Sequence, residues 1–142
     1  MPQNLTATKS IVIAASPERV WEALTDPAQI KQYMWGSEAV SDWRQGSPLI
    51  YRGVWEGKPF EDKGTILEID PPRLLRTNYY SPLSGKPDVP ENYAEVSYSV
   101  REVSGGSELT VTQGNIEDEA GKARAEGNWG TALEGIRKVI EG

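Results

Sequence analysis

The pattern of apolar and polar positions at the start of the chain predicts one strand followed by two short helices. The β-branched run 11–13 predicts a strand over residues 8–15. Ser16 and Pro17 then give a helix start signal, because serine caps free N–H groups and proline presets φ at the first helical position. Asp26-Pro27 repeats this signal. We therefore expect a first helix that ends near Thr25 and a second short helix after it.

The middle of the chain carries strand and turn signals. Period-two alternation predicts strands over residues 36–43, 49–55, 60–69, 74–80 and 93–103, and a last strand with Leu109, Val111 and Gln113 on one face. Residues 70–73 predict a turn, because proline supplies no donor to a strand ladder. The proline-rich residues 81–92 predict a surface loop, and residues 104–107 a hairpin turn. Short connections of this kind favour an antiparallel sheet.

The C-terminal part, residues 118–141, predicts one long helix. Trp129, Leu133, Ile136 and Ile140 are spaced four, three and four residues apart, which places them on one helical stripe. Four glycines lie inside this helix, at positions 121, 127, 130 and 135, and each costs about 0.5–1 kcal/mol relative to alanine. Packing must therefore hold the helix. We expect Gly121 to permit close packing on the sheet, whereas the other three glycines permit either close packing or room for a guest.

The predicted order of elements indicates a single two-layer α+β domain over residues 1–142. One strand, two short helices, about six further strands and one long helix would give a curved antiparallel sheet covered by the long helix. A chain of 142 residues can hold a full core and a modest cavity.

Several segments in this order resemble the activator-of-Hsp90-ATPase-like branch of the START/Bet v 1-like (SRPBCC) superfamily. They are Ser16-Pro17-Glu18-Arg19-Val20-Trp21, Leu24-Thr25-Asp26-Pro27, Ile30-Lys31, the stretch 64–69 followed by Asp70-Pro71-Pro72 and Leu75, and Asn128-Trp129-Gly130 with Leu133. The resemblance implies a helix-grip fold, in which a curved sheet of about six to seven strands wraps around the long C-terminal helix, with a cavity between the two. It also implies a range of functions, because such domains include carriers of small hydrophobic ligands, cyclases and aromatases, and co-chaperone domains.

Composition excludes several kinds of chemistry. The chain has no cysteine and no histidine, which rules out disulfides, thiolate nucleophiles and every Ser-His or Cys-His catalytic pair. We find no metal or nucleotide signature and expect no cofactor. The net charge of −6 is spread evenly along the chain, so we expect neither nucleic acid nor an anionic membrane as a partner. A cytoplasmic location is the default expectation, because no apolar run is long enough for a signal or a membrane span.

Aromatic residues supply the candidate site. Eleven of the twelve, five Trp and six Tyr, carry a polar group, which suits a pocket that is apolar yet offers hydrogen bonds. Strand parity, read beside the family pattern, directs one set toward the long helix. The candidate ligand-binding residues are Trp35, Tyr51, Trp55, Tyr79, Tyr98, Gln113, Trp129 and Leu133. Filling of a shallow core is the alternative for these aromatics, and we prefer it for Trp21 and Trp43.

Catalytic residues are not evident. No two carboxylates stand on one strand face at a spacing that indicates a catalytic pair; Asp62 and Glu68 share a strand, but Glu68 has an ordinary setting. The leading hypothesis is non-catalytic binding of a small hydrophobic or amphipathic ligand between the sheet and the C-terminal helix. The alternatives are a protein-interaction domain with a chaperone or other protein partner, as in Hsp90 co-chaperones, and an enzyme of the cyclase/aromatase type.

Overall fold

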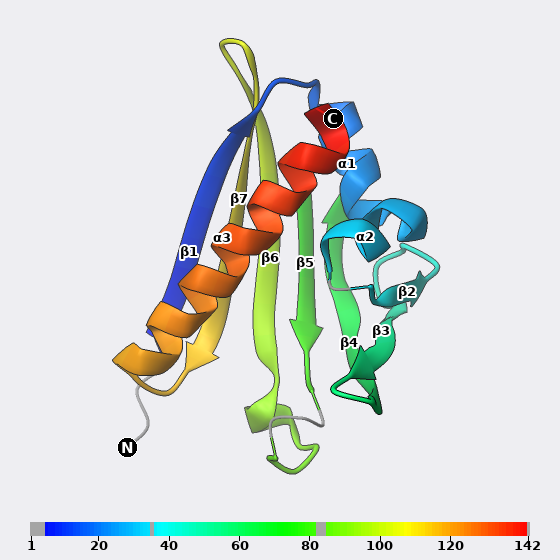
Figure 1. Cartoon of the computed structure of the whole chain (residues 1–142), viewed down its shortest axis with the longest axis vertical. Helices are drawn as coiled ribbons and strands as arrows, with labels where there is room; N and C mark the ends of the chain where they lie inside the picture. The colour runs from blue at the N-terminus through cyan, green and yellow to red at the C-terminus, as the bar shows by residue number, and fades with distance from the viewer. Residues whose placement is uncertain (1–4, 35, 82–84, 142) are drawn as a thin grey trace.

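Two layers, a sheet and a long helix, build the molecule in the computed structural model, which describes residues 5–34, 36–81 and 85–141. The elements in chain order are β1 (Leu5–Ile13), α1 (Pro17–Thr25), α2 (Pro27–Tyr33), β2 (Glu38–Ser41), β3 (Pro48–Trp55), β4 (Lys58–Asp70), β5 (Leu74–Tyr79), the 3₁₀ turn η2 (Pro90–Asn92), β6 (Ala94–Val103), β7 (Gly106–Ile116) and α3 (Glu119–Glu141). Within these described ranges, seven strands form one antiparallel sheet in the order β1-β7-β6-β5-β4-β3-β2. The predicted α+β helix-grip architecture is confirmed (Figure 1).

Local signals set the two short helices. The Ser16 Oγ accepts a hydrogen bond from the Arg19 backbone N–H at 3.2 Å, and Pro17 opens α1. Asp26 is both the last cap of α1 and the first cap of α2, and its Oδ1 accepts the Ala28 N–H at 3.1 Å. Its extended backbone, with φ −99° and ψ 113°, separates the two helices. The prediction of two helices divided at this residue is therefore confirmed.

The strand that we predicted over residues 36–43 is shorter in the structure. Only Glu38–Ser41 is extended, as β2. Trp43 has a φ of 56°, in the left-handed region that regular strands do not contain. The strand therefore cannot extend to Trp43, as the prediction had it. The Trp43 side chain is half-buried against the core, in line with the structural interpretation that we preferred for it.

A bulge in β4 changes which side chains face α3. The pairing of β4 with β5 shifts register between Ile66 and Glu68. Ile66 is fully buried and Ile69 packs against the core, whereas Glu68 lies on the opposite face, where it accepts a hydrogen bond from Arg76 at 2.8 Å. Strict alternation would have put Asp62 and Glu68 on one face. Because a bulge adds one residue to a strand, the two carboxylates are on opposite faces.

The long helix crosses one face of the sheet and ends beside α1 and α2 (Figure 1). Leu133 and Ile136 are buried, and Trp129 and Ile140 pack half-buried against the core, so the predicted stripe is confirmed. The C-terminal half of α3 therefore closes a packed core. The N-terminal half lies over a different environment, described below.

The four glycines of α3 differ in how closely other atoms approach them. A Cβ on Gly121 would lie 3.2 Å from the Ile116 side chain at the end of β7, which agrees with close packing on the sheet. A Cβ on Gly135 would lie 2.8 Å from the Tyr33 Cβ, so the close approach there is to α2. Gly127 has open space around it, and Gly130 meets only Lys9 at 3.9 Å. Of the two alternatives left open for these glycines, close packing therefore does not apply to Gly127 and Gly130.

Two matched substitutions on α3 test this difference. Gly127→Ala should raise the free energy of unfolding by about 0.5–1 kcal/mol, because alanine is the better helix former and no atom obstructs it. Gly135→Ala should lower the free energy of unfolding by about 1–3 kcal/mol, because its methyl group would force α2 and α3 apart. Urea melts of both variants check this, and equal stabilisation of the two would contradict the packing described here.

Candidate functional site

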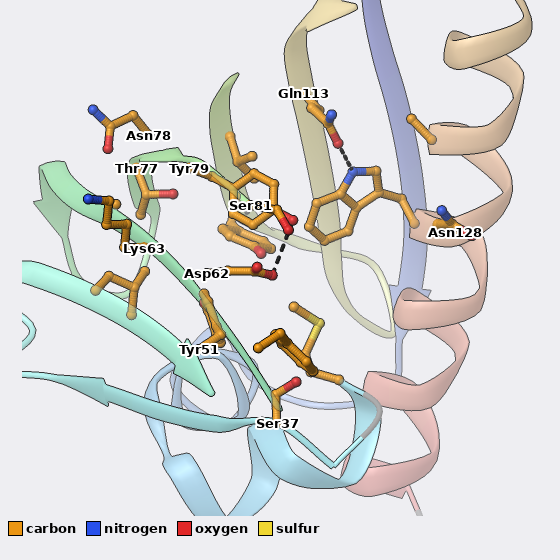
Figure 2. Close-up of a pocket in the computed structure, with 18 of the residues that line it drawn as sticks. Ser37, Tyr51, Asp62, Lys63, Thr77, Asn78, Tyr79, Ser81, Gln113 and Asn128 are labelled. Atoms are coloured by element: carbon orange, nitrogen blue, oxygen red, sulfur yellow. Dashed lines mark hydrogen bonds between the residues drawn. The ribbon is translucent and has the colours of Figure 1, made fainter. Parts of the chain in front are cut away.

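A cavity of about 650 Å³ lies between the sheet and the N-terminal half of α3. Strands β3 to β7 supply its floor, α3 supplies one wall, and the segment between α2 and β2 closes another side (Figure 2). The residues that line the cavity include Ser37, Tyr51, Asp62, Thr77, Tyr79, Ser81, Tyr98, Gln113, Ala125 and Trp129.

Strand register brings the floor residues together. Tyr51 on β3 stands directly opposite Asp62 on β4. In the next part of the sheet, Thr77, Val96 and Gln113 form one row across β5, β6 and β7. Directly opposed residues of antiparallel strands share a face, so each row presents its side chains to the same side. Both rows line the cavity.

The structure places the eight predicted ligand-binding residues in three groups. Tyr51, Tyr79, Tyr98, Gln113 and Trp129 line the cavity. Leu133 does not; it is 2% exposed in the core under the C-terminal half of α3. Trp35 and the side chain of Trp55 lie outside the described residues.

Trp129 joins the helix to the floor of the cavity. Its indole Nε1 donates a hydrogen bond to the Gln113 Oε1 at 2.8 Å (Figure 2). Its ring meets the Tyr98 ring edge-on, with centroids 5.8 Å apart and an interplanar angle of 83°. This geometry is the favoured one for aromatic pairs. Gln113 therefore orients Trp129, a role that parity alone did not indicate.

Three tyrosines, Tyr51, Tyr79 and Tyr98, contribute hydroxyl groups to the aromatic lining of the cavity. Burial raises the pKa of Tyr51 and of Tyr98 well above the usual value. Burial, and then the Asp62 charge, raises the pKa of Tyr79 to about 12. All three phenols therefore keep their protons at neutral pH. Within the described residues, neither Tyr51 nor Tyr98 makes a hydrogen bond through its hydroxyl, so both are available to a guest.

Asp62 is the acidic side chain of the cavity wall, and sequence analysis did not select it. Its Oδ2 accepts a hydrogen bond from the Tyr79 hydroxyl at 3.2 Å (Figure 2). Burial raises its pKa, while hydrogen bonds from Ser81 and Tyr79 act in the opposite direction. Its Oδ1 is buried and receives no donor from the described part of the chain. The available signal was its place opposite Tyr51 in the β3–β4 hairpin.

Charged and polar groups lie at the rim of the cavity. Arg124 and Asn128 are exposed on α3, and Lys63 on β4 forms an ion pair with Asp88. None of the ion pairs found among the described residues includes Asp62. The interior therefore combines aromatic walls with one carboxyl group that no cation neutralises. This arrangement can accept hydrogen bonds from, and donate them to, the polar atoms of a largely apolar guest.

Two other kinds of site are not found in the part of the chain that the structure describes. No three acidic, cysteine or histidine side chains gather where they could hold a metal ion. In the same residues, no helix has the length and apolar character needed to cross a membrane.

The raised pKa of Asp62 makes a prediction about stability. A carboxyl group whose pKa is higher in the folded state stabilises the fold below its unfolded value of 3.8, and that stability is lost as the pH rises through the folded pKa. Asp62→Asn stays neutral at every pH. Its free energy of unfolding should therefore exceed that of the natural chain at pH 7, and the difference should shrink toward pH 3.5 in urea melts.

Asp88→Asn is the matched control for this measurement. Its hydrogen bond with Lys63, followed by one with Tyr93, lowers the pKa of Asp88. The sign is therefore opposite: this variant should be slightly less stable than the natural chain at pH 7. The same pH dependence for both variants would show that the environment of Asp62 is not as described.

Comparison with known proteins shows to which family the chain is related. The family model described as Activator of Hsp90 ATPase homolog 1-like protein matches residues 14–141. The solution structure of ChR145 from Cytophaga hutchinsonii has 45% sequence identity and a TM-score of 0.86, and the match covers 99% of this chain and 96% of that one. No protein with a curated description matches the chain.

More distant structures share the fold. Protein CV1439 from Chromobacterium violaceum is 22% identical with a TM-score of 0.78, over 96% of this chain and 97% of that one. CalU16 from Micromonospora echinospora is 22% identical with a TM-score of 0.72, over 99% and 86% of the two chains. The family match spans nearly the whole chain, and the order of elements agrees with the resemblance seen in the sequence. The chain belongs to the Activator of Hsp90 ATPase homolog 1-like protein family.

Proposed function

We propose that this protein binds a small hydrophobic or amphipathic molecule in the cavity between the sheet and α3, without transforming it. The observation that carries the proposal is the cavity itself, of about 650 Å³, in a domain of this size. Pockets for small molecules are usually about 300–1,000 Å³ and combine apolar walls with a few polar groups. A protein-interaction domain would instead call for a filled core and an exposed apolar patch.

The lining supports a guest that is largely apolar. Phe60, Tyr79, Tyr98 and Trp129 contribute rings, and Leu49 and Val96 contribute aliphatic surface. The free hydroxyls of Tyr51 and Tyr98 can hydrogen-bond a polar atom of the guest. Transfer of apolar surface from water to such walls supplies the binding free energy, and the hydroxyls would set the orientation.

A purely binding role is favoured over catalysis by what stands around Asp62. General acid–base chemistry is most efficient where the pKa of the group that moves the proton lies near the working pH. The tyrosines beside Asp62 have raised pKa values, so they are poor bases at neutral pH. A cytoplasmic location and the absence of nucleic-acid partners stay predictions from composition.

Filling the cavity from α3 should weaken binding. Ala125 is half-buried and lines the cavity, whereas Ala123 on the same helix is exposed to solvent. Ala125→Phe should weaken binding of the apolar dye Nile red by about tenfold or more, which is about 1.4 kcal/mol. Ala123→Phe should leave the affinity unchanged. Dye fluorescence titrations measure both.

Competition separates a cavity from a sticky surface. 1-Decanol, a neutral amphiphile with an O–H donor, should displace Nile red from the natural chain, and the emission of the dye should fall to the weak level that it has in water. If the dye is not displaced and both phenylalanine variants bind it equally, the cavity is not the site. The protein-partner alternative would then be the better account.

A further inference from the structure

The cavity wall holds a carboxyl group whose hydrogen-bonding capacity is only partly used. An ionised carboxylate can accept about four hydrogen bonds. In Asp62 the Tyr79 and Ser81 hydroxyls supply donors, and Oδ1 has none from the described residues. Burying a charged oxygen without a hydrogen-bond donor costs free energy, so a donor supplied by a guest would lower the free energy of the complex.

Among the described residues, no cation forms an ion pair with Asp62. Lys63, the next residue along β4, is held by Asp88 at the rim of the cavity. Glu61, the residue before, points to the other face and pairs with Arg52 at 3.5 Å. The labelled neighbours of Asp62 in the cavity are Tyr51, Tyr79 and Ser81, as Figure 2 shows.

A guest in the cavity can reach the carboxyl group. Asp62 is only half-buried as a residue and lines the cavity. The last torsion of an aspartate side chain is broad, so rotation about it can turn the buried Oδ1 toward a donor of the guest. Tyr51 stands directly across the hairpin from Asp62 and offers its hydroxyl on the same side. One end of the cavity thus holds an acceptor beside a donor.

We infer that Asp62 selects guests that present a hydrogen-bond donor, an O–H or N–H, on an otherwise apolar framework. This inference rests on the proposed binding function and names the class of ligand. The donor completes the set of hydrogen bonds on the carboxyl group, while the rings of Tyr79, Tyr98 and Trp129 cover the apolar part. A guest with only acceptor atoms would leave Oδ1 without a partner and place its own lone pairs against the carboxylate.

Three naphthalene probes of similar size test the selection by isothermal titration calorimetry at pH 7. They are 2-naphthol, which offers a neutral O–H donor, 2-(aminomethyl)naphthalene, which offers a cationic N–H donor, and 2-methoxynaphthalene, which offers none. The natural chain should bind at least one donor probe about tenfold more tightly than the methyl ether, as is typical for a hydrogen bond to a charged group. The better of the two donor probes tells whether a hydroxyl or an amine is the preferred donor.

Variants of Asp62 show whether this group is the cause. Asp62→Leu should remove the preference and let the more apolar methyl ether bind at least as well as 2-naphthol. Asp62→Asn keeps the shape of the side chain, and the advantage of the cationic probe should disappear with the charge. Glu61→Gln is the matched control: it changes a carboxylate one residue away, on the opposite face, and the preference should remain.

The outcomes separate this inference from the proposed function. If all three probes bind and the preference is the same in Asp62→Leu as in the natural chain, selection by Asp62 is wrong while the cavity remains a binding site. If the methyl ether binds the natural chain most tightly, the inference is likewise overturned. If none of the probes binds, and Nile red does not bind either, the binding function itself is wrong.

Discussion

Trp129 is the contact on which the cavity depends. The C-terminal half of α3 packs closely, with Leu133 and Ile136 buried in the core and Gly135 against Tyr33 of α2. One to two turns earlier, the indole ring stands on Tyr98 and its N–H is tied to Gln113. The indole therefore spans the space between α3 and strands β6 and β7, and its ring forms part of the cavity wall.

The electrostatic character of the cavity follows from its position in the sheet. Phenol hydroxyls that lie out of water keep their protons, so Tyr51, Tyr79 and Tyr98 act as neutral hydrogen-bonding groups. Asp62 differs from the tyrosines, because it is the acidic residue of the described lining. Lys63, the next residue along β4, pairs with Asp88 and not with Asp62. A recognition site of this kind gains specificity from a few polar groups and affinity from the rings around them.

The outer face of the sheet is kept distinct from this interior. Arg52, Arg76 and Arg101 each lie within 3.5 Å of a glutamate on a neighbouring strand, and their side chains stay in contact with water. Exposed pairs of this kind contribute little stability individually. Their effect is to make one face of the sheet polar, which leaves the other face as the place where α3 can bury apolar surface.

The sequence by itself determined the order of elements, because helix caps, turn residues and apolar periodicity act over a few neighbouring positions. Ser16, Pro17 and Asp26 were enough to place both short helices, and the stripe through Trp129, Leu133 and Ile136 was enough to orient α3. Four of the eight predicted site residues, Tyr51, Tyr79, Tyr98 and Gln113, line the cavity because strand parity assigns a face locally, and Trp129 lines it from the apolar stripe of α3.

Tertiary structure alone decided the rest. The β4 bulge turned Glu68 away from Asp62, and no local pattern marks where a strand gains a residue relative to its partner. Leu133 lies in the core under the C-terminal half of α3, although it belongs to the same stripe as Trp129, which lines the cavity. The isolation of Asp62 was equally hidden, because it depends on where Lys63, Tyr79 and Ser81 lie after folding. Contacts between residues distant in sequence set these features, and their energies are realised only once the sheet and helix have come together.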